Sequence, residues 1–461
     1  TLLASSAASD VYKRQDYTLT KSITITTAGV YNLTGTIDDG VVTINTKGNV
    51  KLVLNNVNIT NSKGPAIYVK DADTVVIETS SGSTNYLEDS ETYSGYDTDE
   101  IGTIFSHNDI SFEGKGTLVV KSNNEDAIVG KDALKIVSGT YEITAKDDGI
   151  RGKDSVYIKN GKFKITSSGD AIKSTNDTDS TKGYVLIENG TFDINATLDG
   201  IQAETKLLIK DGIFNIITGG GSVNASTKEE WGHWGSSSST DSESAKGIKA
   251  GDNLFIENGT INIDSSDDSM HSNNYIGIKA GTITLSSGDD GIHADTELII
   301  DSGNINIEKS YEGLESSKMT INNGEISVTS SDDGINVAGG NDSSAMGRPG
   351  ANNFSSNTSN ILTINGGSIY VDADGDGIDV NGSAYINGGN ITVDGPSNGG
   401  NGALDYDQEF VINGGTLVAG GASGMAQGAS SSSKVYNLLV NFTSTYSSGD
   451  KTVSYTHLRA H

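Results

Sequence analysis

The dominant feature of this chain is a repeat of about 22 residues, and one clear copy is Asp289–Ser310, DDGIHADTELIIDSGNINIEKS. When the copies are aligned on their first apolar residue, six of the ten steps between aligned residues are 21 or 22 residues long. The aligned residues are Ile128, Ile150, Ile172, Ile201, Ile248, Met270, Ile292, Leu314, Ile335, Ile378 and Leu404. A period of this length is typical of solenoid proteins, in which each copy stacks on its neighbours.

Apolar residues within each copy alternate with polar ones. Leu298 and Ile300 precede Gly303, and Ile305 and Ile307 follow it. A spacing of two indicates strands rather than helices, and Gly, Asn and Asp mark the turns between them. Each copy therefore holds three short strands. We predict an all-β chain that forms a right-handed parallel β-helix, a solenoid with rungs of about 22 residues whose aligned apolar residues fill a dry interior.

The residue before each aligned position is small in every copy. These residues are Ala127, Gly149, Ala171, Gly200, Gly247, Ser269, Gly291, Gly313, Gly334, Gly377 and Ala403. A tight corner between two strands favours such residues. The columns expected to face outward are polar, so we look for function on the outer surface.

Composition and charge limit the classes of partner. The 461 residues are 34% hydrophobic and contain 58 Gly and no Cys, but the regular apolar columns exclude disorder for most of the chain. Without Cys there is no disulfide or thiolate-metal site to consider. No apolar run is long enough to span a membrane. The formal net charge of −29 repels nucleic acids and anionic membranes, so we expect neither as a partner.

The repeat also predicts how the chain is organised. We expect non-native tails at residues 1–15 and 453–461, less regular rungs over 16–124, and regular rungs over 125–452 with loop insertions at 222–244 and 339–360. The two tails match nothing in the repeat and resemble translated adapter sequence. On this interpretation a signal peptide is missing from the sequence, and its absence gives no information on location.

An acidic residue stands two positions before the aligned residue in nearly every copy. These residues form what we call the acidic column, namely Asp126, Asp148, Asp170, Asp199, Asp268, Asp290, Glu312, Asp333 and Asp376. Rungs stack about 4.8 Å apart. Neighbouring carboxylates at that distance repel by roughly 0.9 kcal/mol even in water. A column of this length therefore needs a physical explanation.

Two explanations fit the acidic column. In the first, each Asp accepts backbone N–H groups at the corner, as Asp often does before Gly. In the second, carboxylates on neighbouring rungs chelate Ca²⁺, a hard cation that prefers oxygen ligands. The candidate metal ligands are Asp147, Asp148, Asp170, Asp199, Asp268, Asp290, Glu312 and Asp333.

The residue after each aligned position forms a second column, which we call the basic column and expect to face outward. Its members with a basic side chain are Arg151, Lys173, Lys249, His271 and His293. They either offset the charge of the acidic column or contact the hydroxyls and carboxylates of a sugar polymer. His271 and His293 stand one rung apart, which also raises the hypothesis of a shared metal.

The two Trp residues of the chain, Trp231 and Trp234, lie in the Ser-rich insertion at 222–244. Long loops on a rigid scaffold often carry binding groups. An indole ring there either stacks on a sugar or packs the loop onto the solenoid. The sequence has no Cys nucleophile, phosphate-binding loop or zinc pattern.

Several strings carry a resemblance to a known family. They are GPAIYVKDAD, DDGIRGKDSV, GDAIKSTNDTDSTKGY, DGIQAET and GNGALDYD. Together with the rung pattern over about residues 22–450, the chain resembles secreted bacterial carbohydrate-binding β-helix proteins, which are related in fold to pectate-type polysaccharide lyases. The resemblance implies a right-handed parallel β-helix that binds calcium and plant cell-wall polysaccharides such as cellulose and polygalacturonate. It also implies a secreted or cell-surface location.

Three functions remain open at this point. The first is calcium-dependent binding of polygalacturonate or pectin, and of cellulose, by a monomer. The second is a polysaccharide lyase, in which calcium acidifies a proton of a uronate and Arg151 or Lys173 removes it. The third is a wall-anchored spacer or adhesin, for which the acidic column is only corner chemistry.

Overall fold

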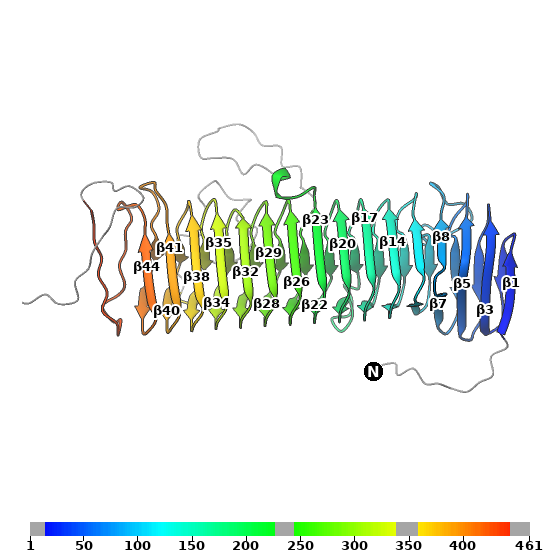
Figure 1. Cartoon of the computed structure of the whole chain (residues 1–461), viewed down its shortest axis with the longest axis horizontal. Coiled ribbons are helices and arrows are strands. Elements are labelled where there is room, and N and C mark those ends of the chain that lie inside the picture. Colours follow the sequence, from blue (N-terminus) through cyan, green and yellow to red (C-terminus); the bar gives the residue numbers. More distant parts are fainter. Residues whose placement is uncertain (1–13, 226–243, 338–357, 443–461) are drawn as a thin grey trace, which may run out of the picture.

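The computed structural model describes residues 14–225, 244–337 and 358–442. These residues form strands β1 to β44 and one short 3-10 helix, η1 (Ser222–Asn224). Successive rungs stack along one long axis, with their strands paired in parallel (Figure 1). The predicted all-β parallel β-helix is confirmed.

Each regular rung contributes three strands, so the solenoid has three faces. The first face is a separate sheet of short strands that begin at the aligned apolar residues. It comprises β2 (Ile23–Ile25), β4 (Val42–Asn45), β6 (Ile67–Asp71), β9 (Ile104–Ser106), β12 (Ile128–Gly130), β15 (Ile150–Gly152), β18 (Ile172–Ser174), β21 (Ile201–Ala203), β24 (Ile248–Ala250), β27 (Met270–Ser272), β30 (Ile292–Ala294), β33 (Leu314–Ser316), β36 (Ile335–Val337), β39 (Ile378–Val380) and β42 (Leu404–Tyr406).

The second face follows a corner after the first. It comprises β7 (Val75–Thr79), β10 (Ile110–Gly114), β13 (Ala133–Ile136), β16 (Ser155–Ile158), β19 (Tyr184–Ile187), β22 (Lys206–Ile209), β25 (Asn253–Ile256), β28 (Tyr275–Ile278), β31 (Glu297–Ile300), β34 (Lys318–Ile321), β37 (Ile361–Ile364), β40 (Ser383–Ile386) and β43 (Glu409–Ile412).

The third face holds the longest strands of the regular rungs. It comprises β8 (Thr84–Glu88), β11 (Thr117–Lys121), β14 (Thr140–Ala145), β17 (Lys162–Ser167), β20 (Thr191–Ala196), β23 (Ile213–Thr218), β26 (Thr260–Ser265), β29 (Thr282–Ser287), β32 (Asn304–Lys309), β35 (Glu325–Ser330), β38 (Ser368–Ala373), β41 (Asn390–Asp394) and β44 (Thr416–Gly420). A Gly, or a Gly preceded by Asn or Asp, marks many of the turns between the second and third faces.

The first rungs are built differently from the regular ones. Three long strands, β1 (Arg14–Leu19), β3 (Gly29–Ile37) and β5 (Val50–Thr60), pair in series. Strand β5 then pairs with β7 on the second face and with β8 on the third, which joins these two faces into one sheet. Because β1 begins at Arg14, it overlaps by two residues the stretch 1–15 that we expected to be a tail.

The aligned apolar residues form the core. Consecutive ones are direct strand partners, for example Ile150 with Ile172 and Ile292 with Leu314. All eleven are buried, and ten of them have no exposed surface. Each buried side chain of this kind contributes roughly 1.5–3 kcal/mol relative to an exposed one. At the neighbouring corner, a Cβ added to Gly291 would lie 2.6 Å from the Gly313 carbonyl oxygen, which explains why that column is small.

The acidic stretch 86–100 is folded against the solenoid. Asp89 accepts hydrogen bonds from Ser122 Oγ at 2.9 Å and from the Asn123 backbone N–H at 2.6 Å, and it is buried. The Tyr96 ring lies edge-on to that of Tyr68 on the first face, with centroids 5.2 Å apart. The loop after β8 therefore covers the N-terminal part of the first face.

No helix among the described residues has the length and apolar character that crossing a membrane would require.

Candidate functional site

The acidic column lies at the corner where the third face of one rung leads into the first face of the next. Asp148, for example, stands between the end of β14 and the start of β15. We expected an outward-facing row, but the structure buries most of it. The exposed fractions are 0% for Asp126, 3% for Asp148, 2% for Asp170, 2% for Asp199, 0% for Asp268, 4% for Asp290 and 5% for Asp333. Carboxylates this deeply buried need hydrogen bonds or counter-charges.

One carboxylate oxygen of each Asp accepts a hydrogen bond from a backbone N–H group of the next rung. The N–H of Asp148 donates to Asp126 Oδ1 at 3.0 Å, that of Asp170 to Asp148 Oδ1 at 2.9 Å, and that of Asp290 to Asp268 Oδ1 at 3.0 Å. Equivalent bonds to the next rung are accepted by Asp170, Asp199, Asp333 and Asp376. The corner role proposed for these residues is thus present in the structure.

The second oxygen faces the basic column in the N-terminal half. Arg151 Nη2 lies 2.6 Å from Asp126 Oδ2, and Lys173 Nζ lies 2.7 Å from Asp170 Oδ2 and 3.7 Å from Asp148 Oδ2. Lys249 makes the same kind of contact with Asp199, at 3.6 Å. The three bases are therefore paired with the acidic column, as the charge-offset explanation predicts.

Lys173 is held in its charged form. Burial lowers its pKa, but the carboxylates of Asp170 and Asp148 outweigh burial and raise the pKa above the ordinary value for Lys. An ammonium that stays protonated cannot accept a proton from a substrate. The pairing therefore weighs against Lys173 as the base of a lyase.

The middle of the column is a network of Lys, His and carboxylates. Lys246 Nζ lies 2.5 Å from Asp268 Oδ2, and His271 Nδ1 lies 2.9 Å from the same oxygen. One rung further, His293 Nδ1 lies 3.1 Å from Asp290 Oδ2. The two imidazole rings are neighbours, with centroids 4.9 Å apart. The pKa of Asp268 lies well below its usual value, because Lys246 and His271 together outweigh its burial.

Our expectation that His271 and His293 face outward is wrong. Their exposed fractions are 3% and 1%, because both imidazoles lie against the carboxylates of the acidic column. Burial lowers the pKa of His293, but Asp290, Asp295 and Glu315 outweigh it and raise the pKa far above the ordinary value. A protonated imidazole has no lone pair for a metal, and two buried rings offer little surface to a sugar.

Several groups of side chains have the ligand types of a metal site. In four sets the ligand atoms lie within 4.8 Å of one another. These sets are Asp126, Asp147 and Asp148; Asp267, Asp268 and Asp289; Asp268, His271 and His293; and Asp290, His293 and Glu315. In the first set, burial raises the pKa of Asp126 to about 7 despite Arg151, and that of Asp148 to about 6 despite Lys173.

The C-terminal part of the two columns lacks bases. We call it the acidic end, and it consists of Glu312, Glu315, Asp333, Asp376, Asp379 and Asp405. Over the described ranges, no Lys or Arg forms an ion pair with any of these six side chains, but Glu315 Oε2 lies 3.1 Å from His293 Nδ1. Asp379 and Asp405 occupy the positions that Arg151 and Lys173 hold in earlier rungs, so an acid stands where a base stood.

The pKa values at the acidic end are raised chiefly by burial, as are those of the paired Asp126 and Asp148. Burial and the neighbouring Asp376 and Asp405 raise the pKa of Asp379 to about 7. Burial also raises that of Asp376 to about 6. The pKa values of Glu312 and Asp333 lie well above the ordinary range, first through burial and then through neighbouring carboxylates. These four carboxyl groups therefore hold a proton more tightly than ordinary carboxyls do.

Asn336 lies inside the acidic end and is only 2% exposed. Its Nδ2 donates to Glu312 Oε2 at 2.6 Å, and its direct strand partner on the next rung is Asp379. Its Oδ1 is buried without a hydrogen-bond partner in the described part of the chain. Carboxylate oxygens together with one free amide oxygen form a donor set that suits Ca²⁺. The ligand types at the acidic end are thus those that Ca²⁺ prefers, whereas the four sets whose ligand atoms lie within 4.8 Å of one another do not include Glu312, Asp333 or Asp379.

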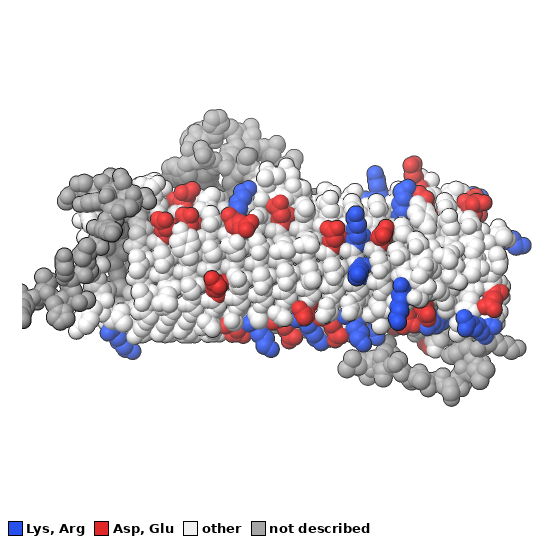
Figure 2. Space-filling view, viewed as in Figure 1, with Lys and Arg blue, Asp and Glu red and all other residues white. Residues whose placement is uncertain are grey.

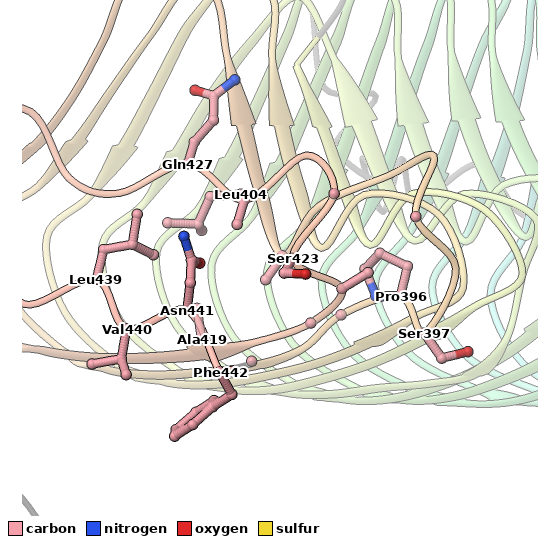
Figure 3. Close-up of a pocket in the computed structure, with 18 of the residues that line it drawn as sticks. Pro396, Ser397, Leu404, Ala419, Ser423, Gln427, Leu439, Val440, Asn441 and Phe442 are labelled. Carbon is pink, nitrogen blue, oxygen red and sulfur yellow. The ribbon is translucent and has the colours of Figure 1, made fainter. Parts of the chain in front are cut away.

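Trp231 and Trp234 fall outside the described residues, as do most of the insertions at 222–244 and 339–360. A hollow at the C-terminal end is lined by small and apolar residues such as Leu404, Ala419 and Val440, with Gln427 nearby (Figure 3). None of the predicted site residues lines this hollow.

A family model described as "Carbohydrate-binding domain-containing protein" matches residues 20–291 and 289–334. The chain belongs to this family. The match covers the first face from β2 to β33 and the acidic column from Asp126 to Asp333, so the paired part of the column is a feature of the matched region.

Two similar proteins add to this result. A carbohydrate-binding domain-containing protein of Acetivibrio thermocellus is 37% identical over 130 residues, which is 27% of this chain and 46% of that protein. The match thus spans about half the length of the curated relative. Among solved structures, the polysaccharide lyase-like protein from C. thermocellum, a gadolinium derivative, is 32% identical and covers 45% of this chain and 91% of that chain, with a TM-score of 0.43.

Proposed function

We propose that the protein binds acidic plant cell-wall polysaccharide, of the polygalacturonate or pectin type, with calcium held at the acidic end. The observation that carries the proposal is the group of buried carboxylates around Asp333, Asp379 and Asn336, which has no Lys or Arg counter-charge in the described residues. The family adds that the ligand is a carbohydrate.

The charge of the chain is the physical reason for a cation. A protein with net charge −29 repels a polyuronate, so attraction needs positive charge at the contact. Glu312, Asp333 and Asp379 would hold the ion together with Asn336 Oδ1, while the partly exposed Asp376 and Asp405 lie at the rim. When bound, calcium supplies a charge that can share its oxygen shell with the carboxylates of a sugar chain.

The N-terminal half of the column has a different role in this proposal. Arg151, Lys173 and Lys249 neutralise Asp126, Asp170 and Asp199, so these rungs are held together without a metal. The raised pKa of Lys173, one of the two candidate bases, favours binding over cleavage. We further propose a secreted or cell-surface monomer, since its ligand lies outside the cell.

The test is binding of polygalacturonate with calcium and with excess chelator. Asp379→Asn is the diagnostic variant, because it removes a charge while keeping the shape of the side chain. Asp193→Asn is the matched control, since Asp193 is an exposed acid on the third face. We expect chelator and Asp379→Asn each to lower affinity at least tenfold, or about 1.4 kcal/mol, and the control to behave as the wild type.

Three results would count against the proposal. Unchanged binding of polygalacturonate in excess chelator would show that binding does not need a cation. Equal losses of affinity for Asp379→Asn and Asp193→Asn would show that only the overall charge of the protein matters. Formation of unsaturated uronate, measured by its ultraviolet absorbance, would show that the protein is a lyase.

A further inference from the structure

One base interrupts the acidic column. Lys246 stands two positions before Ile248, where the neighbouring rungs have Asp199 and Asp268. The Lys and Arg side chains that Figure 2 shows in blue lie at the surface, where water solvates them. Lys246 is instead the only Lys or Arg that is buried among the described residues. Because an ammonium group is unfavourable away from water, its presence here needs a chemical reason.

The register of the sheet holds Lys246 against two carboxyl groups of the next rung. The N–H of Gly247 donates to the Asp268 carbonyl oxygen at 3.0 Å, which places the two corners side by side. Lys246 Nζ lies 2.5 Å from Asp268 Oδ2 and 3.1 Å from Asp267 Oδ1. The side chain of Asp268 has no exposed surface, whereas that of Asp267 is 27% exposed. An amine and a carboxyl group are thus in contact inside the protein, with a second carboxylate beside the nitrogen.

Both oxygens of the Asp268 carboxyl group also face hydrogen-bond donors. The Asp290 backbone N–H donates to Oδ1 at 3.0 Å, and His271 Nδ1 lies 2.9 Å from Oδ2. Donors in these positions stabilise negative charge on the oxygens, and so make the carbon between them easier to attack. Asp267 Oδ1 is close enough to accept a proton from the attacking nitrogen. The groups around this carbon therefore resemble those of an acyl-transfer site.

Two other lysines show what is different about Lys246. Lys173 Nζ lies 2.7 Å from Asp170 Oδ2, but the Lys173 side chain is 27% exposed. Lys249 Nζ lies 3.6 Å from Asp199 Oδ2, and its side chain is 23% exposed. Water stabilises the charges of both these pairs. The side chain of Lys246 is only 9% exposed, so its pair loses most of that hydration, and attraction between buried charges repays such a loss only in part. An amide in the same place carries no charge.

We propose that Lys246 and Asp268 condense to an amide, an intramolecular isopeptide bond that links two successive rungs through their side chains. A proton first passes from Nζ to the carboxyl group, which gives a neutral amine and a neutral acid. Nζ then attacks Cγ of Asp268, and Asp267 and His271 transfer a second proton from the nitrogen to Oδ2. A C–N bond forms, the Cγ–Oδ2 bond breaks, and the oxygen leaves as water with both protons. No oxidant, cofactor or other reactant is consumed.

The ion pair is the starting point of this reaction. Burial raises the pKa of Asp268, but Lys246 and His271 outweigh burial and lower the pKa, so the charged pair is the form that reacts. The low polarity around the pair disfavours both charges at once and therefore eases proton transfer between them. Hydrolysis of the product would require water to reach a side chain that has no exposed surface.

The bond lies where the solenoid is interrupted. Lys246 follows the insertion at 222–244, and Asp268 belongs to the next rung. A covalent link between side chains that are 22 residues apart would keep these two rungs in register even when the hydrogen bonds of the corner open. The inference goes beyond the proposed function, because the bond needs neither calcium nor a polysaccharide.

The intact mass of the full chain, measured after purification and unfolding, tests the proposal. We expect the wild type to be lighter, by one molecule of water, than its sequence requires. After digestion with trypsin, the peptide that contains Lys246 should be joined to the peptide that contains Asp268, without cleavage after Lys246. Lys173 and Lys249 are internal controls, since we expect trypsin to cleave after both and neither to be linked.

Two variants separate the bond from the fold. Lys246→Arg keeps the positive charge, but a guanidinium group is a poor nucleophile, so we expect the full mass of the variant sequence. Asp267→Asn keeps both reacting groups and removes only the proton acceptor beside the nitrogen. We expect Asp267→Asn to fold like the wild type by circular dichroism, with a cross-linked fraction at least about tenfold smaller in a matched preparation.

Several outcomes would overturn the inference. A wild type with the full sequence mass would show that Lys246 and Asp268 form an ion pair only. Loss of water without joined peptides would indicate a cyclic imide within one segment of the chain, and a link to Asp267 would show that the assigned carboxyl group is wrong. Equal cross-linking in Asp267→Asn and the wild type would refute the role of Asp267 as the proton acceptor.

Discussion

The substitution Asp379→Asn, made in the absence of metal, is expected to stabilise the protein at neutral and alkaline pH. Asp379 is 9% exposed, and burial with its acidic neighbours raises its pKa from 3.8 to about 7. Each pH unit corresponds to about 1.4 kcal/mol, so ionising this carboxyl in the folded protein costs about 4 kcal/mol. An amide at the same position never ionises.

The sign of the pH dependence follows from that pKa. Below pH about 4 the carboxyl is protonated in both the folded and the unfolded chain, and the full stability is present. As the pH rises from about 4 through about 7, only the unfolded chain releases the proton readily, so the wild type loses stability. Asp379→Asn should lose less over the same window. The two proteins should be equally stable near pH 4 and differ by up to about 4 kcal/mol near pH 8.

Urea unfolding followed by circular dichroism in excess chelator, at pH 4, 6 and 8, measures this difference. Asp193→Asn serves as the control for a simple loss of one negative charge, because its carboxyl is exposed on the third face. A variant that is no more stable than the wild type at pH 8, or one with an unchanged pH dependence, would refute the account of the acidic end as an uncompensated buried charge.

Three further predictions concern other parts of the molecule. Ile292→Asp places an unpaired charge in the dry interior and should abolish the cooperative unfolding transition, whereas a preserved transition would argue against the core assignment. Lys173→Met leaves Asp170 buried without its partner and should cost about 3–5 kcal/mol at pH 8 in urea unfolding. Alanine at Trp231 and Trp234 should lower glycan affinity with little change in melting temperature, and the reverse pattern would assign these residues to packing.

The sequence specified the fold well because the solenoid is built from local, repeated choices. The spacing of Ile150, Ile172 and Ile201 predicted which residues would become strand partners, and the structure has that register. The small column was predicted as a corner, and the close approach of Gly291 to the next rung explains it. Periodicity is informative here because each rung repeats the same contacts with its neighbours.

The candidate site was predicted less completely. The identity of the acidic residues could be read from the repeat, but their burial could not, because it depends on how the corner side chains turn. His293 was expected on the surface, yet its partners Asp290 and Glu315 draw it into the column. The sequence also could not show that the two oxygens of one carboxylate have different partners. In Asp126, for example, one oxygen accepts from the Asp148 backbone N–H and the other pairs with Arg151.

One feature was present in the sequence as a weaker signal. Comparing the acidic column with the basic column along the chain would have shown that the basic residues end at His293 and that Glu315, Asp379 and Asp405 follow. The loop after β8 left no such signal, since Tyr96 packs on Tyr68 across a turn that no repeat defines.

The most direct test of the central claim is a crystal structure of the protein with calcium, with the ion located by its anomalous scattering. The account predicts an ion at the acidic end, bound by oxygens of Asp333, Asp379 and Asn336, and its loss in Asp379→Asn crystals grown in the same way. An acidic end that stays free of calcium while the protein still binds polygalacturonate would contradict it.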